Sequence, residues 1–461
     1  MRIKVTAFIL TLMLCFSFVG SSFAENENIK NDKVNIENES TQEEKIVAKS
    51  PHAIVLDMRT GAVLYKKKAG ERVYPAALTN IMTAVLVLEH CNMEELVVAS
   101  ETALSNVKAG DNKMGIVKEE KLSVRQLLYG MMLESASDAA SVLAEKTSGS
   151  IEKFVSLMNE KAHSLGMKNT NFTNPTGEHD ERHYTTASDM AILTRYAMGI
   201  SEFCEVVKCQ SYSIPATEKN HTSRKITNRN HFVSNLLRND YYYKYSTGIK
   251  TGYNPEAKSC IAASAEKNGM ALIAIVFEAE TQDNVAQSFT DCRDMFDFVF
   301  ENYVSQTIVS EGEIIAQTEI LNTRRDNKLI LKAENKVSVI RKRDSEDIEV
   351  TYKDTLAKEV SAPVEKNERI GVREYFLNGK SIGKLNLLAE KSYALDPITF
   401  LVNKMIAFVT SPWLFVAIVI AIFILVMAER RRRRILRKKR RDARNRRNRE
   451  LMRSLDDLDI E

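Results

Sequence analysis

The sequence predicts an α/β domain, then a small all-β domain, and finally one transmembrane helix. Three observations support this prediction. Between residues 51 and 303, apolar strand patterns stand at both ends of a run of helical patterns, as in one domain whose terminal segments share a sheet. Residues 304–395 contain short alternating strands separated by charged turns. Residues 405–428 carry no charged side chain.

The elements of the first domain follow from hydrophobic periodicity and turn residues. Thr60 and Gly61 separate two short apolar runs and so predict a β-hairpin over residues 53–65. A period of 3.6 residues predicts a helix from Ala76 to Glu89. The remaining expected elements are helices at 123–145, 151–164, 188–198 and 283–302, and strands at 210–214, 261–265 and 270–278.

The N-terminus has the pattern of a secretory signal peptide, which we place at residues 1–24. Arg2 and Lys4 precede an uncharged apolar stretch, and Ser22 and Ala24 occupy the small-residue positions of a cleavage site. Residues 25–50 are rich in Glu, Asn and Lys and lack aromatic side chains, so we predict a disordered acidic linker. Cleavage would leave five cysteines, an odd number that makes no disulfide framework.

The uncharged stretch at 405–428 is long enough to cross a membrane. As a helix it would rise about 36 Å, against a hydrocarbon core of roughly 30 Å. Arg430 to Arg434 follow it directly, and the positive-inside rule places such residues in the cytoplasm. We therefore predict a single-pass protein of the bacterial cell membrane, with large extracytoplasmic domains and a cytoplasmic tail at residues 429–461.

Charge is distributed unevenly along the chain. The formal net charge is +4, yet residues 429–461 hold 15 Lys/Arg and 7 Asp/Glu, a net of +8 that leaves −4 for the rest. The segment from Arg430 to Arg453 is either a topology signal with surplus charge or a surface for anionic lipids of the inner leaflet. Nucleic acid is not an expected partner, because the tail has no aromatic side chains to stack on bases.

Three short segments contain chemically informative residues. Residues 75–83 read Pro-Ala-Ala-Leu-Thr-Asn-Ile-Met-Thr, and residues 248–253 read Gly-Ile-Lys-Thr-Gly-Tyr. Residues 129–140, between them, read Tyr-Gly-Met-Met-Leu-Glu-Ser-Ala-Ser-Asp-Ala-Ala. In this order, with the segments that connect them, they resemble the serine D-alanyl-D-alanine carboxypeptidases, the low-molecular-weight penicillin-binding proteins. The resemblance covers about residues 50–300 and, more weakly, the β-rich region to about 395.

The resemblance implies a D,D-peptidase/β-lactamase-like fold, an antiparallel sheet flanked by helices, and a role in peptidoglycan metabolism. It also shows two replacements in the first motif, which the family writes as Pro-Ala-Ser-x-x-Lys-Ile-Met-Thr. Ala77 stands in the place of the nucleophilic serine, and Asn80 in the place of the activating lysine. Thr79 is no substitute, since it lies about 200° around the helix from Ala77.

The second and third motifs are better preserved. Ser135 matches the serine of the family's Ser-x-Asn motif, in which it relays protons, while Ser137 replaces the asparagine. Lys250, Thr251 and Gly252 keep the third motif, whose lysine binds the substrate carboxylate in the family. On a presumed edge strand these three residues offer a cation, a hydroxyl and backbone groups to a peptide.

Two classes of function remain open. Ala77 has no attacking atom and Asn80 no titratable nitrogen, so we predict a pseudoenzyme that binds peptidoglycan stem peptides or other envelope proteins. Its binding residues would be Ser135, Lys250, Thr251 and Gly252. The alternative is an active serine-type carboxypeptidase whose chemistry has moved to Ser135 and Lys250. We expect neither a cofactor nor a metal for either function.

Overall fold

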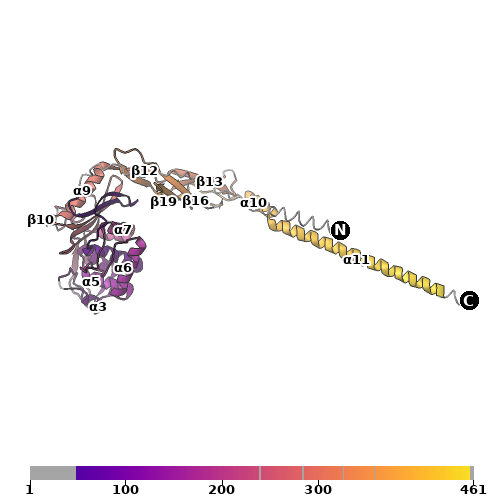
Figure 1. Ribbon diagram of the computed structural model, residues 1–461, viewed down its shortest axis with the longest axis horizontal. Coiled ribbons are helices and arrows are strands. Elements are labelled where there is room, and N and C mark those ends of the chain that lie inside the picture. The colour runs from indigo at the N-terminus through magenta and orange to yellow at the C-terminus, as the bar shows by residue number, and fades with distance from the viewer. Residues whose placement is uncertain are drawn as a thin grey trace. The chain divides into compact units, whose positions relative to one another are not determined.

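The computed structural model describes residues 48–456, except for 109, 238–239, 283–284, 325–326 and 358. The predicted signal peptide, nearly all of the predicted acidic linker and the last five residues of the tail lie outside the described residues. The predicted elements can therefore be compared with the structure from the first hairpin onward (Figure 1).

The first domain is built on a five-stranded antiparallel sheet with the order β2-β1-β9-β8-β7. Its two edge strands are therefore β2 and β7. The predicted hairpin and the predicted strands at 261–265 and 270–278 belong to this sheet, whereas the strand predicted at 210–214 lies in a separate two-stranded sheet. The strands of the five-stranded sheet are β1 (His52–Asp57), β2 (Val63–Lys67), β7 (Ser246–Asn254), β8 (Lys258–Lys267) and β9 (Met270–Ala279).

The sheet separates two apolar cores. Alternate side chains of β1 point to opposite faces, so that Ile54 packs in one core and Val55 in the other. The central strand β9 is buried on both faces, which explains why its sequence is an almost continuous apolar run. Helix α9 (Gln287–Asn302) covers one face, and α7 (Ala187–Ala197) lies with other helices against the second (Figure 1).

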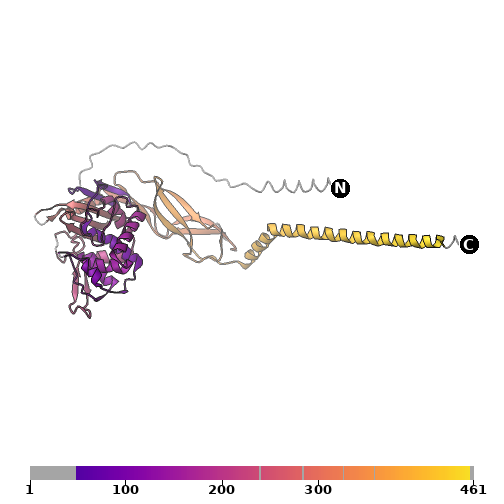
Figure 2. The same cartoon turned by 60° about the horizontal axis from the view of Figure 1, so that its bottom comes forward.

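The other helices complete this domain around the second face of the sheet (Figure 2). The helices are η1 (Ala76–Thr79), α2 (Asn80–His90), α3 (Glu101–Ser105), α4 (Val124–Glu134), α5 (Ser137–Ser148), α6 (Ile151–Leu165) and α8 (Ser201–Lys208). The short strands are β3 (Leu96–Val98), β4 (Lys121–Ser123), β5 (Ser211–Ile214), β6 (Arg224–Thr227), β10 (Thr281–Gln282) and β11 (Val285–Ala286).

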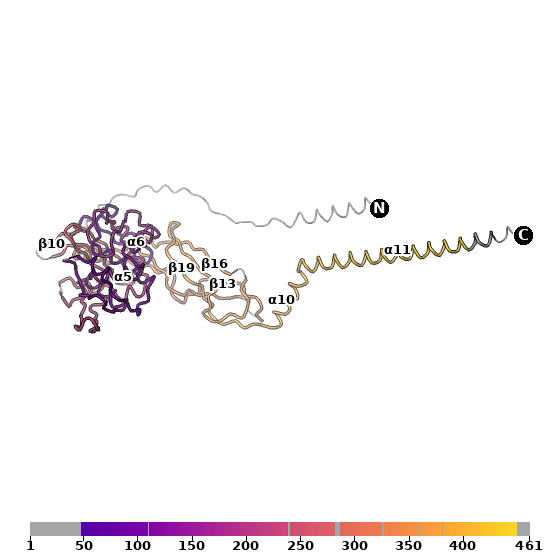
Figure 3. Tube along the Cα trace, turned by 90° about the horizontal axis from the view of Figure 1, so that it is seen from below, coloured from indigo at the N-terminus to yellow at the C-terminus, as the bar shows by residue number. Residues whose placement is uncertain are grey.

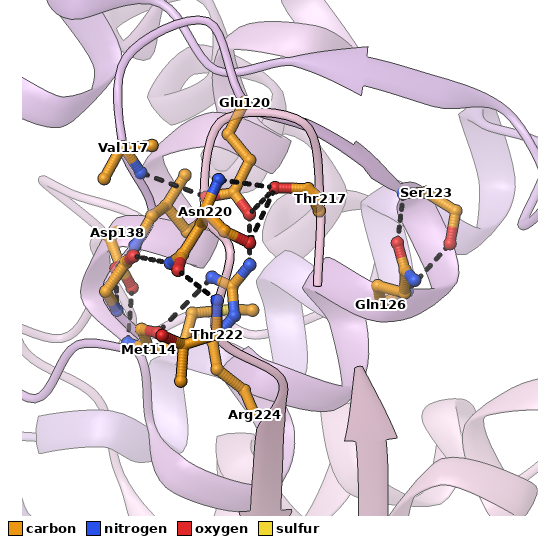
Figure 4. Close-up of polar contacts among 12 residues, drawn as sticks. Met114, Val117, Glu120, Ser123, Gln126, Asp138, Thr217, Asn220, Thr222 and Arg224 are labelled. Carbon is orange, nitrogen blue, oxygen red and sulfur yellow. Dashed lines mark hydrogen bonds and ion pairs between the residues drawn. The ribbon is translucent and has the colours of Figure 1, made fainter. Parts of the chain in front are cut away.

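The prediction of a single helix at residues 123–145 is wrong. Residues 123–145 form two helices, α4 and α5, because Ser135 adopts a left-handed conformation with φ +58° and ends α4. The start at residue 123 is confirmed: Ser123 and Gln126 form a reciprocal capping box at the first turn of α4 (Figure 4). Helix α8 was not predicted from the sequence.

The second domain consists of strands, as predicted. Its main sheet has the order β16-β18-β19-β14-β13-β17, and β12 pairs with β15. Leu331, Leu385 and Leu387 are among the side chains of its separate core. The strands are β12 (Tyr303–Val309), β13 (Ile314–Leu321), β14 (Lys328–Ala333), β15 (Val337–Lys342), β16 (Thr351–Leu356), β17 (Val360–Ser361), β18 (Arg369–Leu377) and β19 (Lys380–Ala389).

Two helices follow the second domain (Figure 3). The predicted span at 405–428 is not continuous, because α10 (Pro397–Val409) ends before Pro412, where α11 (Pro412–Asp456) begins. Proline has no N–H to donate and is favoured in the first turn of a new helix. The segment Pro412–Arg449 of α11 has the length and apolar content of a membrane-crossing helix.

Candidate functional site

Ala77 lies at the start of the predicted first helix, inside the tight turn η1. Two glycines pack closely against the backbone around Ala77. A Cβ atom on Gly177 would lie 1.8 Å from the carbonyl oxygen of Ala76, and one on Gly252 would lie 3.0 Å from the amide nitrogen of Ala77. Strand β7 and the loop at 174–178 therefore both meet the position at which the family has its nucleophile.

Asn80 begins α2 and is 2% exposed. Its Nδ2 donates to the carbonyl oxygen of Pro175 at 3.2 Å, and Thr83 Oγ1 donates to the same oxygen at 2.7 Å. Within the described residues, Asn80 Oδ1 is buried without a hydrogen-bond partner. Asn80 thus ties α2 to the neighbouring loop and presents an acceptor that no described protein group satisfies.

The loop beside Ala77 is rigidly hydrogen-bonded. Asn174 Oδ1 accepts the N–H groups of Thr176, Gly177 and Glu178 at distances of 3.2, 2.8 and 3.1 Å. Such repeated acceptance by one asparagine side chain is a common way to hold a turn. The sequence showed the segment as part of the resemblance, but not that it forms a wall of the site.

His183 fixes the same loop to the first helix. Burial lowers the pKa of His183 to about 4, so the ring is neutral at pH 7. Its Nδ1 accepts the Thr173 N–H at 3.1 Å, and its Nε2 lies 2.9 Å from Thr79 Oγ1. The Nδ1 acceptor role places the proton on Nε2. Thr79 is therefore buried against His183, which agrees with the prediction that it faces away from the position of Ala77.

The break between α4 and α5 places Ser135 and Ser137 in the site. Ser135 lies at the left-handed end of α4, a conformation that is uncommon for residues other than glycine. Ser137 begins α5, and its N–H donates to the carbonyl oxygen of Asn112 at 2.8 Å. Asp138 then accepts the N–H of Met114 at 3.1 Å and fastens the loop that contains Asn112 (Figure 4).

Lys250 is the central cation of the site. Its Nζ donates to Ser135 Oγ, which joins residues 115 positions apart in the sequence. Burial lowers the pKa of Lys250 to about 7, and the nearby guanidinium of Arg229 acts in the same direction. Among the described residues no carboxylate forms an ion pair with Lys250. A partly neutral amine therefore faces a hydroxyl group in a dry environment.

The remaining residues of the third motif lie on the same strand. Gly252 packs against the backbone of Ala77, and Thr251 is half-buried beside it. Strand β7 ends the sheet, so one row of its backbone groups has no partner strand. The prediction that this motif occupies an edge strand is confirmed. The structure thus places Lys250 beside Ser135, and Gly252 of the same strand beside the Ala77 backbone.

A buried ion pair supports the wall on the side of Ser137. Glu120 is fully buried, and Arg224 Nη2 donates to its Oε1 (Figure 4). Thr217 Oγ1 donates to the same oxygen at 2.8 Å, and Asn220 Nδ2 donates to the Gly115 carbonyl at 3.3 Å. These contacts join the β5–β6 hairpin to the loop below Ser137. Sequence inspection did not find them.

The side chains described above limit the reactions that the site can perform. Within the residues that the structure describes, no cluster of three metal-ligating side chains occurs, and the five thiols there are unpaired. The site lacks a hydroxyl at Ala77 and retains one hydroxyl–amine pair, Ser135 with Lys250. That pair is the one arrangement at the site with the components of a nucleophile and a base.

Comparison with known proteins agrees with the fold and the motif order. Residues 37–281 match the D-alanyl-D-alanine carboxypeptidase family, peptidase S11, and residues 303–394 match the C-terminal domain of penicillin-binding protein 5. The chain is 30% identical over 397 residues to the D-alanyl-D-alanine carboxypeptidase DacF of Bacillus subtilis, covering 85% of this chain and 95% of that protein.

Solved structures show the same architecture. The crystal structure of penicillin binding protein 5 from Haemophilus influenzae is 25% identical, with a TM-score of 0.53, and the match covers 75% of this chain and 97% of that one. A peptidoglycan synthesis regulatory factor from Streptococcus pneumoniae is 22% identical, with a TM-score of 0.63 and coverage of 75% and 99%. This chain therefore belongs to the D-alanyl-D-alanine carboxypeptidase family.

Proposed function

We propose that this chain is a catalytically inactive, membrane-anchored member of its family that binds peptidoglycan stem peptides or other envelope proteins. The proposal rests on Ala77, whose side chain is only a methyl group. Gly177 and Gly252 enclose the backbone at this position, so the frame of the site is kept while the attacking atom is absent. Asn80 cannot take up a proton near pH 7, so the activating base is absent as well.

The retained strand supports a binding role. An extended peptide can pair with the free edge of β7, a recognition mode in which main-chain hydrogen bonds supply affinity. Lys250 lies on this strand without a carboxylate partner among the described residues. The terminal carboxylate of a peptide would supply the missing counter-charge, and a charge-assisted hydrogen bond of this kind is stronger than a neutral one.

The first test is covalent labelling. The ectodomain, residues 25–403, is expected to form no adduct with a fluorescent penicillin and to release no D-alanine from a stem-peptide mimic. Loss of the nucleophile alone costs on the order of 10⁶-fold in subtilisin, a serine protease whose catalytic residues act as a unit. Intact-mass measurement checks the expectation. An added mass equal to one penicillin, lost in Ser135→Ala, would contradict it.

The second test concerns Lys250 itself. Lys250→Ala is expected to weaken noncovalent binding of a soluble stem peptide by about 10- to 150-fold, because a hydrogen bond to a charged group is worth about 1.5–3 kcal/mol. Isothermal titration gives the affinities. Lys153→Ala is the matched control, since Lys153 is an exposed cation on α6 outside the site. Equal affinity for Lys250→Ala and the unchanged protein would leave the fold with a purely structural role.

One observation favours a second candidate function, an active carboxypeptidase with relocated chemistry. Lys250 touches Ser135 Oγ, and burial lowers the pKa of its amine to about 7. In such a reaction Ser135 Oγ would attack the peptide carbonyl and pass its proton to Lys250. The amide bond would break with the proton going to the leaving D-alanine, and water would hydrolyse the acyl ester. The labelling test above separates the two functions.

The apolar part of α11 supports a membrane location, and the orientation of α11 is part of the proposal. The basic residues that follow the apolar half of α11 favour a cytoplasmic tail by the positive-inside rule. The two folded domains would then lie outside the cytoplasm, where peptidoglycan is found. Protease accessibility of the tail in intact cells and in inverted vesicles tests this orientation.

A further inference from the structure

The second domain has a polar hollow of its own, of about 520 Å³, on the solvent side of its main sheet. Three neighbouring strands, β14, β19 and β18, contribute to it, together with the turns that precede β13 and β18. We call it the Lys332–Arg369 hollow. The residues around it are Glu311, Gly312, Lys332, Ala333, Glu334, Asn367, Arg369, Asn386 and Leu388.

The strand register places two cations side by side in this hollow. Leu388 pairs with Lys332 on one flank and with Arg369 on the other. Directly paired residues project from the same face of a sheet, so all three side chains lie on the solvent side. Strands are about 4.8 Å apart, which separates the Cα atoms of Lys332 and Arg369 by about 10 Å. Both long side chains can therefore reach one small anion above Leu388.

Two carboxylates, Glu311 and Glu334, also line the hollow. Glu334 accepts the Nδ2 of Asn386 at 2.7 Å. Glu313 accepts the Ser310 N–H, and Glu368 the Glu365 N–H, each at 2.8 Å. Glu311 lies exposed at the rim. Among the described residues, Lys332 and Arg369 form no ion pair. The hollow thus holds two cations that form no ion pair with the described carboxylates.

We infer that the Lys332–Arg369 hollow binds an oxyanion, either a phosphate or a carboxylate, carried by an envelope polymer or peptide. Arginine presents a planar fork that matches two oxygens of such a group, and lysine adds a point charge. This site is independent of the carboxypeptidase-like site in the first domain. It gives the second domain a binding function of its own.

The test uses the full chain in neutral detergent, with hydrogen–deuterium exchange as a readout that separates the hollow from the basic tail. The amides of Gly312 and Asn367 donate to strand carbonyls of Ala333 and Ala389, both at 2.9 Å. An anion bound across the hollow should slow their exchange. Inorganic phosphate and acetate are titrated at constant ionic strength, with chloride as the replaced anion.

Three variants each remove one positive charge. Lys332→Met and Arg369→Met should need at least about ten times more anion for the same protection, which is the loss of one charge-assisted contact. Lys336→Met is the control, because Lys336 is exposed and does not line the hollow. Arg369 is exposed too, so its variant is expected to fold even if Lys332→Met is unstable.

Each outcome decides the inference. Protection by phosphate alone supports a phosphate-bearing polymer, and protection by acetate as well supports a peptide carboxylate. An equal loss in Lys336→Met would mean diffuse attraction, and the inference would be wrong. The inference would also be wrong if neither anion slowed amide exchange at Gly312 and Asn367 in the unchanged chain.

Discussion

At the scale of single residues, the structure around Ala77 and Asn80 accommodates both side chains. Ala77 needs less space than serine, and its backbone keeps its contacts with Gly177 and Gly252. Asn80 is buried but neutral, so it avoids the large cost of burying an unpaired charge. Its amide also gains a hydrogen bond to Pro175. The fold of the site therefore accommodates a methyl group at Ala77 and a neutral amide at Asn80.

Lys250 should make stability depend on pH. Its pKa is lowered to about 7 in the folded chain, against an ordinary value near 10.5. Between these two values the unfolded chain binds the proton and the folded chain does not, so the free energy of unfolding should rise as pH increases from 7 to 10. Chemical denaturation of the ectodomain at several pH values in this window measures the effect.

Lys250→Met should reduce this rise and should raise stability at pH 7, because it removes a charge that folding must desolvate. Tyrosines and cysteines also titrate near the upper end of the window, so the difference between variant and unchanged protein is the relevant quantity. Lys153→Met, on an exposed helix face, should keep the full rise. Identical slopes for all three proteins would show that Lys250 stays protonated when buried.

At the scale of elements, the site depends on the close approach of strand β7 and the 174–178 loop to the turn η1. Gly177 has φ +83°, and a Cβ atom there would clash with the backbone of Ala76. Gly149 has a nearly identical φ of +84°, with no atom within 4 Å of its Cβ position. The two glycines share a backbone conformation and differ in the space around them.

This pair of glycines allows a controlled prediction. Gly149→Ala should destabilise the ectodomain by about 1–2 kcal/mol, the cost of a left-handed alanine. Gly177→Ala should cost about 1–3 kcal/mol more, because the surrounding backbone must also move. It should also abolish stem-peptide binding. Urea denaturation and titration of the two variants check both statements, and equal destabilisation would mean that the loop moves away freely.

At the scale of the whole molecule, the charge distribution separates the basic tail from the rest of the chain. Helix α11 continues from its apolar half into the basic segment as far as Asp456. The arginines and lysines from Arg430 to Arg453 are exposed wherever the structure describes their side chains. We propose that this exposed basic segment contacts anionic lipids of the inner leaflet.

A peptide of residues 429–461 should bind vesicles that contain anionic lipid, with about 1 kcal/mol for each basic residue near the surface. Binding should fall steeply between low salt and 1 M salt, because the screening length shortens from about 30 Å to about 3 Å. Vesicle sedimentation measures it, and neutral vesicles are the control. Equal binding to neutral vesicles, or binding that salt leaves unchanged, would reduce the tail to a topology signal.

The sequence by itself determined the fold class and the family. These depend on local features: the period of apolar residues, the absence of charge at 405–428, and the identities of Ala77, Asn80 and Lys250 along short segments. The edge position of the third motif was also predicted correctly, and β7 does end the sheet.

Only the tertiary structure decided how these segments meet. The helical pattern at 123–145 continues through Ser135, so the break there reflects packing against other parts of the domain. The contact between Ser135 and Lys250 joins positions 115 residues apart, and the wall at 174–183 reaches Asn80 across 95 residues. Periodicity reports which face of an element is apolar, but not which distant element covers it. The geometry of the site therefore became visible only in the folded chain.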